Sequence, residues 1–237
     1  MLICDQLCKD YGGFQAVKSL TLRVERGEIF GFLGPNGAGK TSAIKMLMGL
    51  LVPSSGHATI DGLDTQRDHV AVKSRVGYLP DNPHFLDYLR GRELLSFVGE
   101  MHGLAPAEAR VRAKHWIQDL GLEDAQEDFA NNYSTGMKKR LGLACALIHN
   151  PKVLILDEPT NGLDPRSAVH VRDLILNFAA EGRTVLLSTH LLDLAERLCH
   201  RLGILHHGQL VAVGTCKELA PDGSLEEKFL ALTADRP

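Results

Sequence analysis

The sequence predicts an α/β fold whose core is interrupted by a block of helices. Short apolar strands alternate with helices in the first 84 residues and again after residue 150. The strand "KVLILDEP" is continuously apolar, as strands inside a parallel sheet are. Between these parts the apolar spacing is helical. We therefore expect a core at 1–84 and 151–217, a helical subdomain at 85–150 and a short helical tail at 218–237.

The elements of the first part follow from local spacing. Apolar residues at Ile44, Met48 and Leu51 share one helical face, which predicts a helix over 41–50. The alternating run "LTLRV", the apolar run "IFGFL" and two short runs before turns predict strands. These strands are expected at 20–24, 29–33, 57–62 and 74–80.

The remaining elements restore the alternation after the helical block. A capping box from Ser224 to Glu227 predicts that a short amphipathic helix opens the tail. Breaks at glycine and proline separate the helices of the block. Helices are expected at 92–104, 106–122 and 136–148, after Pro165 and from Leu191, and strands at 152–159, 184–190, 202–208 and 210–214.

The composition restricts the classes of function. The 237 residues carry a formal net charge of -3, so the chain lacks the overall basic surface that nucleic-acid binding requires. The basic clusters "KSR", "RVRAK" and "KKR" are expected on solvated faces. Five scattered cysteines without metal-ligand spacing favour a reducing compartment. No apolar run approaches the length of a membrane span.

The segment "GPNGAGKT" carries the strongest chemical signal. It fits the pattern G-x-x-x-x-G-K-[ST] between a predicted strand and a predicted helix, the context in which such a loop binds phosphate. Backbone N–H groups and the positive end of the helix would face phosphate oxygens. Lys40 is expected to reach the terminal phosphates and Thr41 to offer its hydroxyl to Mg²⁺. The nucleotide-binding residues expected in this P-loop are Gly34, Pro35, Asn36, Gly37, Ala38, Gly39, Lys40, Thr41 and Ser42.

Two carboxylates end the strand "KVLILDEP". Ligands of α/β proteins bind beyond the carboxyl ends of parallel strands, so these side chains are expected at the ligand edge of the sheet. We expect Asp157 to hold Mg²⁺ through water and Glu158 to polarise the attacking water. The alternative is that both residues cap the next loop, which the P-loop in the same chain makes less attractive.

Six motifs in one order resemble those of a known family. Besides the two above, "YSTGMKKR" is similar to the family signature, "NGLDP" to the D-loop, "LLSTH" to the segment ending in the switch histidine, and "KDYGGFQAV" to the segment that stacks on adenine. The sequence resembles an ATP-binding-cassette (ABC) ATPase from Leu2 to about Lys217. The resemblance implies an α/β fold with a P-loop NTPase (RecA-like) core, an antiparallel β subdomain and an inserted α-helical subdomain.

The resemblance also implies a dimer. In this family two nucleotide-binding domains meet head to tail, and the signature of one covers the γ-phosphate held by the P-loop of the other. Ser134 and Gly136 match the signature positions that contact phosphate. Tyr133, Thr135 and Met137 depart from the usual residues, but these departures spare Ser134 and Gly136, so we expect the signature to function.

Three further residues receive roles from the resemblance. His190 is expected to contact the γ-phosphate and to hold the attacking water with Glu158; the alternative is that it caps the next helix. Asp164 is expected at the dimer interface, a role compatible with capping the helix that starts at Pro165. Tyr11 is expected to stack on the adenine, with Phe14 as its rival.

The loop after the strand at 74–80 departs from the family. Where the family usually places a glutamine that touches Mg²⁺ and relays to the membrane partner, this chain has Asp81. A carboxylate is an oxygen ligand suited to Mg²⁺, and it adds negative charge near Asp157 and Glu158. The alternatives are that Asn82 supplies the amide or that the magnesium contact is weakened.

Two functions share this ATPase chemistry. The first is the ATP-hydrolysing subunit of an ABC transporter, which binds ATP and Mg²⁺ and drives separate transmembrane permease subunits from the cytoplasmic face of the cell membrane. The second is an ABC ATPase of iron–sulfur cluster assembly or another non-transport process. The stretch from the signature to "NGLDP" and the ending after residue 207 resemble the stand-alone ATPases of ABC-2-type exporters, which favours transport. The expected partner cassette is a second copy or a paralogue, and no nucleic acid is expected.

Overall fold

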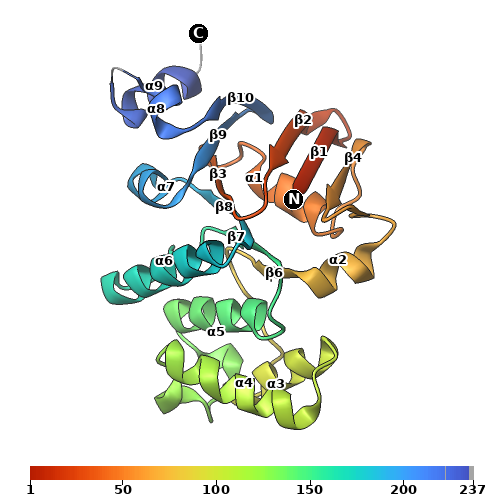
Figure 1. Ribbon diagram of the computed structural model, residues 1–237, viewed down its shortest axis with the longest axis vertical. Coiled ribbons are helices and arrows are strands. Elements are labelled where there is room, and N and C mark those ends of the chain that lie inside the picture. The colour runs from red at the N-terminus through yellow and green to blue at the C-terminus, as the bar shows by residue number, and fades with distance from the viewer. Residues whose placement is uncertain (222, 235–237) are drawn as a thin grey trace. The chain divides into compact units, whose positions relative to one another are not determined.

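The computed structural model describes residues 1–221 and 223–234, which divide into two units (Figure 1). The first unit combines Met1–Lys73 with the part of the chain from Ile175 onward, and the second is Ser74–Leu174. The predicted subdomain boundaries after residues 84 and 150 fall inside the second unit, and that division stays a prediction. The predicted tail begins at 218, and its last residues, 235–237, lie outside the described residues.

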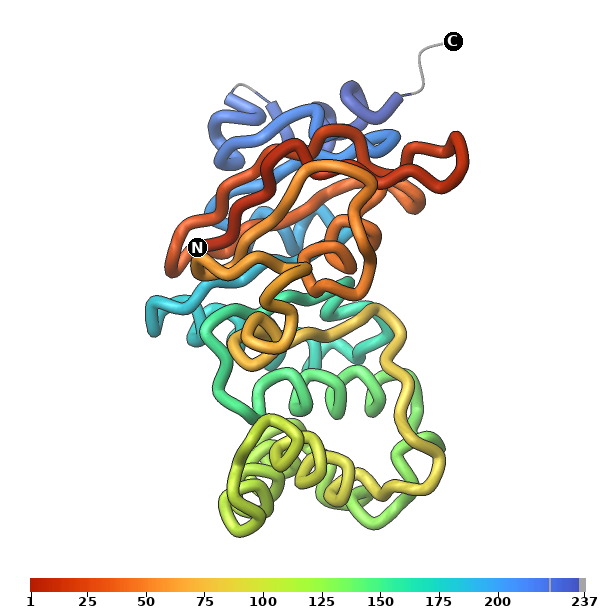
Figure 2. Tube along the Cα trace, turned by 90° about the vertical axis from the view of Figure 1, so that its right-hand side faces the viewer, coloured from red at the N-terminus to blue at the C-terminus, as the bar shows by residue number. Residues whose placement is uncertain are grey.

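An antiparallel sheet in the first unit is built around the N-terminal hairpin. Strands β1 (Leu2–Tyr11) and β2 (Phe14–Val24) pair across a Gly12-Gly13 turn, seen in red in Figure 2. Both glycines have positive φ, at 67° and 105°, which only glycine adopts without strain in such a turn. The other edge of β1 pairs with β4 (Ser55–Ile60), and β5 (Leu63–Asp64) completes the order β2-β1-β4-β5.

Two elements of this region escaped the sequence analysis. In β1 the pairing register shifts between Cys4 and Leu7, and Gln6 has a φ of 45°. This irregularity breaks the period of two by which a half-buried strand is recognised. The short helix α2 (His69–Arg75) was also missed, because of its seven residues only Val72 is buried and no apolar stripe forms.

The second sheet of the first unit carries the parallel strands. Strand β3 (Ile29–Leu33) lies between β8 (Thr184–Thr189) and β9 (Arg201–His206) and is parallel to both, while β10 (Gln209–Gly214) is antiparallel to β9. Every residue of β3 and β8 is buried. The predicted apolar strands are therefore confirmed, because only a strand covered on both faces tolerates such a run.

Besides α2, helices α1, α7, α8 and α9 lie in the described part of the first unit. The helix predicted over 41–50 is α1, one residue earlier at its start, and Ser224 Oγ accepts a hydrogen bond of 3.1 Å from Glu227 N at the predicted cap of the tail helix. Thr215 and Glu218 form a further capping box. The helices are α1 (Lys40–Leu47), α7 (Leu192–Leu198), α8 (Cys216–Leu219) and α9 (Leu225–Thr233).

The second unit contains the predicted helical block. Helices α3, α4 and α5 contact one another, and strand β6 pairs parallel with β7 (Figure 1). Within the described residues, none of the helices combines the length and apolarity that crossing a bilayer demands. The elements are β6 (Val76–Leu79), α3 (Gly91–Met101), α4 (Pro106–Asp119), the short 3₁₀ turns Glu123–Ala125 and Ala130–Asn132, α5 (Thr135–Leu147), β7 (Val153–Asp157) and α6 (Pro165–Ala180), which continues into the first unit.

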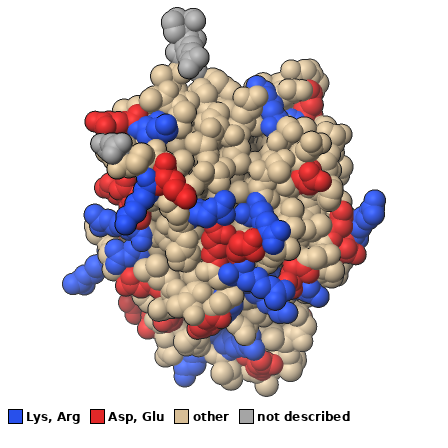
Figure 3. Space-filling view, turned by 45° about the horizontal axis from the view of Figure 1, so that its top comes forward, with Lys and Arg blue, Asp and Glu red and all other residues tan. Residues whose placement is uncertain are grey.

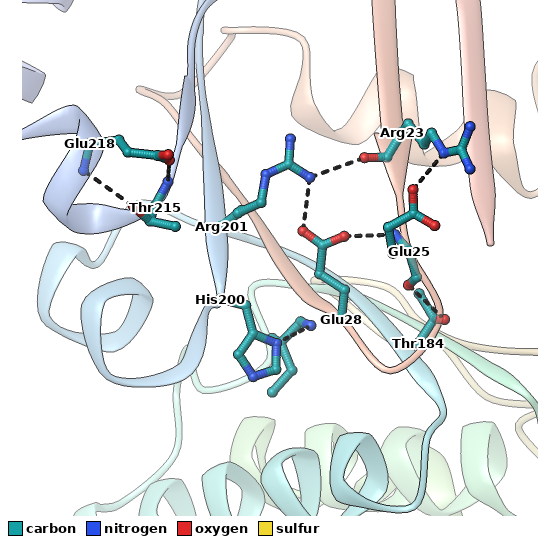
Figure 4. A network of polar contacts seen from close by, with 9 residues as sticks. Arg23, Glu25, Glu28, Thr184, His200, Arg201, Thr215 and Glu218 are labelled. Carbon is teal, nitrogen blue, oxygen red and sulfur yellow. Dashed lines mark hydrogen bonds and ion pairs between the residues drawn. The ribbon is translucent and has the colours of Figure 1, made fainter.

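A polar network anchors the start of β3 (Figure 4). The buried Glu28 carboxylate accepts a hydrogen bond of 2.6 Å from Glu25 N and one of 3.0 Å from Arg201 Nη1. One residue on, Ile29 N donates to His200 Nδ1 at 2.9 Å. Charge-assisted bonds of this kind are among the stronger ones, so the strand that leads into the P-loop is held firmly at its first residue.

We expect Arg201→Met to lower the free energy of unfolding by about 1–3 kcal/mol, because Glu28 keeps its burial and loses its charged partner. The matched control is Arg23→Met, whose pair with Glu25 is exposed, at 62% and 54% of the two side chains. That change should alter stability by no more than about 0.5 kcal/mol. Urea unfolding of both variants measures the difference, and equal losses would contradict it.

Candidate functional site

The P-loop between β3 and α1 needs glycine at two points of close approach. A Cβ on Gly34 would lie 2.4 Å from Leu205 O, and a Cβ on Gly39 would lie 2.3 Å from Ala16 O. Gly39 also has a φ of 103° and is the N-cap residue of α1. The loop backbone is therefore packed against β9 and β2 with no room for a side chain at Gly34 or Gly39, and close approach of a ligand to its peptide groups is favoured there.

Lys40 places a positive charge at this loop. It is the first residue of α1, its side chain is buried, and its Nζ donates to Gly34 O at 2.6 Å and to Pro35 O at 3.1 Å. The first turn of α1 carries no acidic side chain that would offset the positive end of the helix. Thr41, the predicted hydroxyl donor to Mg²⁺, is exposed on the same turn.

A cavity of about 330 Å³ adjoins the P-loop in the first unit, a volume at the lower end of the range for small-molecule sites. Phe14 lines it together with Gly37 of the loop, whereas Tyr11 does not. Both rings are exposed, Phe14 at 65% and Tyr11 at 49%. Phe14, weighed as the rival of Tyr11, is therefore the aromatic side chain that shares a cavity with the P-loop.

The predicted switch histidine follows the carboxyl end of a parallel strand. His190 comes directly after β8 and is exposed. The N-cap residue of α7 is Leu191, whose backbone N–H donates to Thr189 Oγ1 at 3.0 Å. His190 therefore lies outside the N-cap position that was its alternative role, at the strand edge where α/β proteins bind ligands.

The end of β7 carries two buried carboxylates in the second unit. Asp157 is the last residue of the strand and Glu158 is the next, and both are buried. Glu158 has a φ of 50°, and its carbonyl accepts a hydrogen bond of 3.2 Å from Asn161 N. The left-handed conformation costs a residue with a Cβ about 1–2 kcal/mol, and such strain gathers at functional sites.

The predicted signature forms the start of α5. Ser134 is the N-cap residue, and its Oγ accepts a hydrogen bond of 3.3 Å from Met137 N. A Cβ on Gly136 would lie 3.1 Å from Gly162 O, so the signature and the D-loop pack closely within this unit. The first turn of α5 carries no acidic side chain. This helix start is therefore suited to an anion, as the start of α1 is.

Asp164 caps helix α6. Its Oδ1 accepts from Arg166 N at 3.0 Å and from Ser167 N at 3.1 Å, and its Oδ2 accepts from Ser167 Oγ at 2.6 Å. The Ser167 bonds, the side-chain one first, hold the pKa of Asp164 below its usual value. The capping alternative is therefore realised at an exposed carboxylate, and the interface role stays a prediction.

Asp81 contacts a lysine that the sequence analysis did not single out. Lys139 of α5 is 2% exposed, and its Nζ donates to Asp81 O at 2.5 Å, to Asp81 Oδ1 at 3.2 Å and to Asp157 O at 3.5 Å. Asn161 Nδ2 donates to Asp81 Oδ1 at 3.4 Å. The expectation that "KKR" lies on a solvated face is therefore wrong at its central residue. Asn82, the alternative amide, is exposed.

The position of Lys139 had a signal in the helical spacing. It precedes Leu143 by four residues and Ala146 by seven, and all three are buried on α5. A lysine on the apolar face of a helix needs an acidic or carbonyl partner, because an unpaired buried charge is costly. The three basic residues of "KKR" suggested exposure to solvent, whereas the helical spacing indicated that the side chain of Lys139 is buried.

The predicted site residues divide between the two units. The first unit holds Tyr11, the P-loop and His190, and the second holds Asp81, Ser134, Gly136, Asp157, Glu158 and Asp164. Within the second unit Lys139 brings Asp81 and Asp157 to one ammonium group. Acidic and basic side chains are interspersed on the face shown in Figure 3. In the described part of the chain, no three His, Cys, Asp or Glu side chains cluster as metal ligands.

Comparison with known proteins agrees with these features. The family model described as "ABC transporter" matches residues 17–161. The chain is 36% identical over 219 residues to the linearmycin resistance ATP-binding protein LnrL of Bacillus subtilis, covering 92% of this chain and 70% of the relative. It is 41% identical to the daunorubicin resistance ATP-binding protein DrrA3 of Streptomyces coeruleorubidus, covering 89% and 67%. It also matches the daunorubicin/doxorubicin resistance ATP-binding protein DrrA of Streptomyces peucetius at 41% identity, covering 90% of this chain and 64% of the relative.

Solved structures share the fold over nearly the whole chain. One described as an ATP-binding subunit of an ABC transporter superposes with a TM-score of 0.92 at 31% identity, covering 99% of this chain and all of the other. The dimeric post-hydrolysis cassette MJ0796, bound to ADP and phosphate, superposes with a TM-score of 0.83 at 23% identity, covering 91% and 98%. The second likeness supports the fold alone.

The predicted α/β fold with a P-loop core is confirmed by these superpositions. The resemblance to an ABC ATPase is confirmed by the family match and by relatives whose alignments cover most of this chain. The phosphate-type loop with its buried Lys40 and the two carboxylates at the end of β7 thus occur in a chain that matches this family. The chain belongs to the ABC transporter family and is an ATP-binding cassette with ATPase activity.

Proposed function

We propose that this chain is the ATPase subunit of an exporter and works with a second cassette in a head-to-tail dimer. One observation carries the proposal: the chain has two helix starts suited to phosphate, at Gly39–Lys40 of α1 and at Ser134 of α5. In a head-to-tail dimer the first holds the phosphates of one ATP and the second covers the γ-phosphate of the partner's ATP. Each chain then contributes one half of each of two ATP sites. Both helix starts thereby bind phosphate, one at each site.

The proposed roles follow from charge and position. Lys40 binds the terminal phosphates, because a buried ammonium beside the loop carbonyls can turn to a phosphate oxygen at little cost. Glu158 polarises the attacking water from a fixed and strained backbone. His190 contacts the γ-phosphate at the carboxyl end of β8. Asp164 meets the partner cassette while capping α6.

The oxygen donors of the chain fit Mg²⁺. Thr41 offers a hydroxyl and Asp157 a carboxylate, both hard oxygen ligands, and Asp81 is a third candidate. Mg²⁺ held by these residues would supply positive charge that neutralises the phosphates during phosphoryl transfer. Asp81 already shares its Oδ1 with Lys139 and Asn161, so its carboxylate keeps lone pairs for a water or an ion.

The relatives support export over the alternative. The three relatives described above are named for drug resistance, one to linearmycin and two to daunorubicin, and resistance through an ATP-binding subunit suggests the removal of a toxic compound. The proposed partners are permease subunits in the cell membrane, with the cassette at the cytoplasmic face. Iron–sulfur cluster assembly, the other function considered, finds no support among these names. The exported compound is determined by the permease.

The partner tests the proposal directly. Tagged protein purified from detergent-solubilised membranes is expected to bring down a polytopic membrane protein, which mass spectrometry identifies. The control is the same purification without detergent, in which that protein should be absent from the eluate. Recovery of a scaffold of iron–sulfur assembly, with no membrane protein, would support the alternative function.

Glu158→Gln is expected to bind ATP with unchanged affinity and to hydrolyse it about 10²–10⁴-fold more slowly, since it loses the group that polarises water. The variant should accumulate an ATP-dependent dimer, measured by light scattering after gel filtration. Glu226→Gln, at an exposed position in the first turn of α9, is the control and should match the parent. A monomeric and fully active Glu158→Gln protein would contradict the mechanism.

Phe14→Ala is expected to weaken ATP binding at least about fivefold, because an aromatic ring stacked on a base contributes about 1–3 kcal/mol. Tyr11→Ala, at the facing position of the hairpin, should change the Kd by less than about twofold. Fluorescence titration with a labelled ATP analogue measures both. The reverse order of effects would assign adenine stacking to Tyr11, as the family resemblance implied.

A further inference from the structure

Lys139 is a buried charge with every donor engaged. Its ammonium group has three N–H bonds, and three acceptors lie within reach: Asp81 O, Asp81 Oδ1 and Asp157 O. A fully paired ammonium can remain charged in the interior, whereas removal of its partner leaves an uncompensated charge. The lysine therefore joins the loop after β6 to the end of β7 through one atom.

The charge also fits its surroundings. Burial lowers the pKa of Lys139, and the charge of Asp81, its hydrogen bond and the charges of Asp157 and Glu158 offset that lowering only in part. The usual glutamine at the Asp81 position would leave two carboxylates in this region, and the aspartate makes a third. A cation in contact with Asp81 offsets that additional negative charge.

Lys139 belongs to the helix that opens with the signature. It lies five residues after Ser134, in the second turn of α5. Helix α5 therefore presents its N-terminus to the proposed partner nucleotide and the Lys139 ammonium to the Asp81 loop. A displacement of this helix on dimer closure would move the partner of Asp81 directly, because the Lys139 ammonium is buried and lies 3.2 Å from Asp81 Oδ1.

We propose that Lys139 is a positioning residue for ATP hydrolysis, holding the Asp81 carboxylate against the end of β7 and coupling it to the signature helix. The inference deepens the proposed function and rests on it for the role of Asp81. Lys139 acts through Asp81 and the β7 end, without contact to the nucleotide. The lysine and the aspartate form one charge-compensated unit in place of a neutral glutamine.

A double-mutant cycle of Lys139→Gln and Asp81→Asn in the full chain tests the unit. Lys139→Gln should lower kcat for ATP hydrolysis about tenfold, and raise the Mg²⁺ concentration for half-maximal rate, with KM for ATP changed less than about threefold. In the Asp81→Asn background the same change should cost less than about twofold, because no carboxylate is left unpaired. Lys114→Gln, at an exposed lysine of α4 outside the signature, is the matched control and should match the parent.

The second readout is thermal unfolding of the same variants without nucleotide or Mg²⁺. Lys139→Gln should lower Tm by about 5 °C, and the double variant should regain most of that loss. Equal losses in both backgrounds, or Lys139→Gln turnover within twofold of the parent, would overturn the proposal. If the Lys139→Gln protein does not fold, the proposal requires that the double variant with Asp81→Asn folds. A double variant that also fails to fold would overturn the proposal.

The two proposals fail in different experiments. A fully active Glu158→Gln protein contradicts the proposed ATPase mechanism, whatever the cycle shows. If the unfolding cycle shows no coupling energy between Lys139 and Asp81, only the role of the lysine is contradicted, because that measurement contains no ATP.

Discussion

Buried parallel strands carry no charged side chains before their last residue in this chain, and this constraint decides where its charged groups lie. In the first unit β3 and β8 are buried at every residue, so the P-loop and His190 come directly after their last residues. In the second unit β7 is equally buried, and the two carboxylates occupy its last residue and the next. A sheet that is buried on both faces therefore leaves the carboxyl ends of its strands as the place for a site.

The starts of two helices, one in each unit, are also suited to bind an anion. Helices α1 and α5 both begin without acidic side chains, and each presents N–H groups that no intrahelical partner satisfies. They differ in how the start is made: α1 follows a glycine whose packing excludes a side chain, and α5 follows a serine that caps it. The first is a rigid cradle, whereas the second keeps a hydroxyl that can exchange its helix bond for a ligand.

The sequence was most informative where one local pattern had one physical cause. The P-loop, the strands at 29–33 and 184–189 and the cap at Ser224 each follow from spacing alone. It was least informative where a second chain segment decided the outcome. The shifted register hid β1, the sequence did not show that Phe14 and Gly37 line one cavity, and the burial of Lys139 depends on an aspartate 58 residues away. Each of these requires a contact between segments distant in sequence.

The left-handed backbone of Glu158 makes some replacements at this position easier in evolution than others. With a φ of 50°, this site accepts glycine or asparagine more readily than a residue with a larger side chain. Replacement by glycine or asparagine therefore removes the carboxylate and relieves the backbone strain, whereas the isosteric glutamine keeps that strain. A duplicated gene could thus become an inert cassette in a single step that selection for stability would not oppose. Regaining the carboxylate would require the strained conformation to be rebuilt, so the path from active to inactive partner runs more easily in one direction.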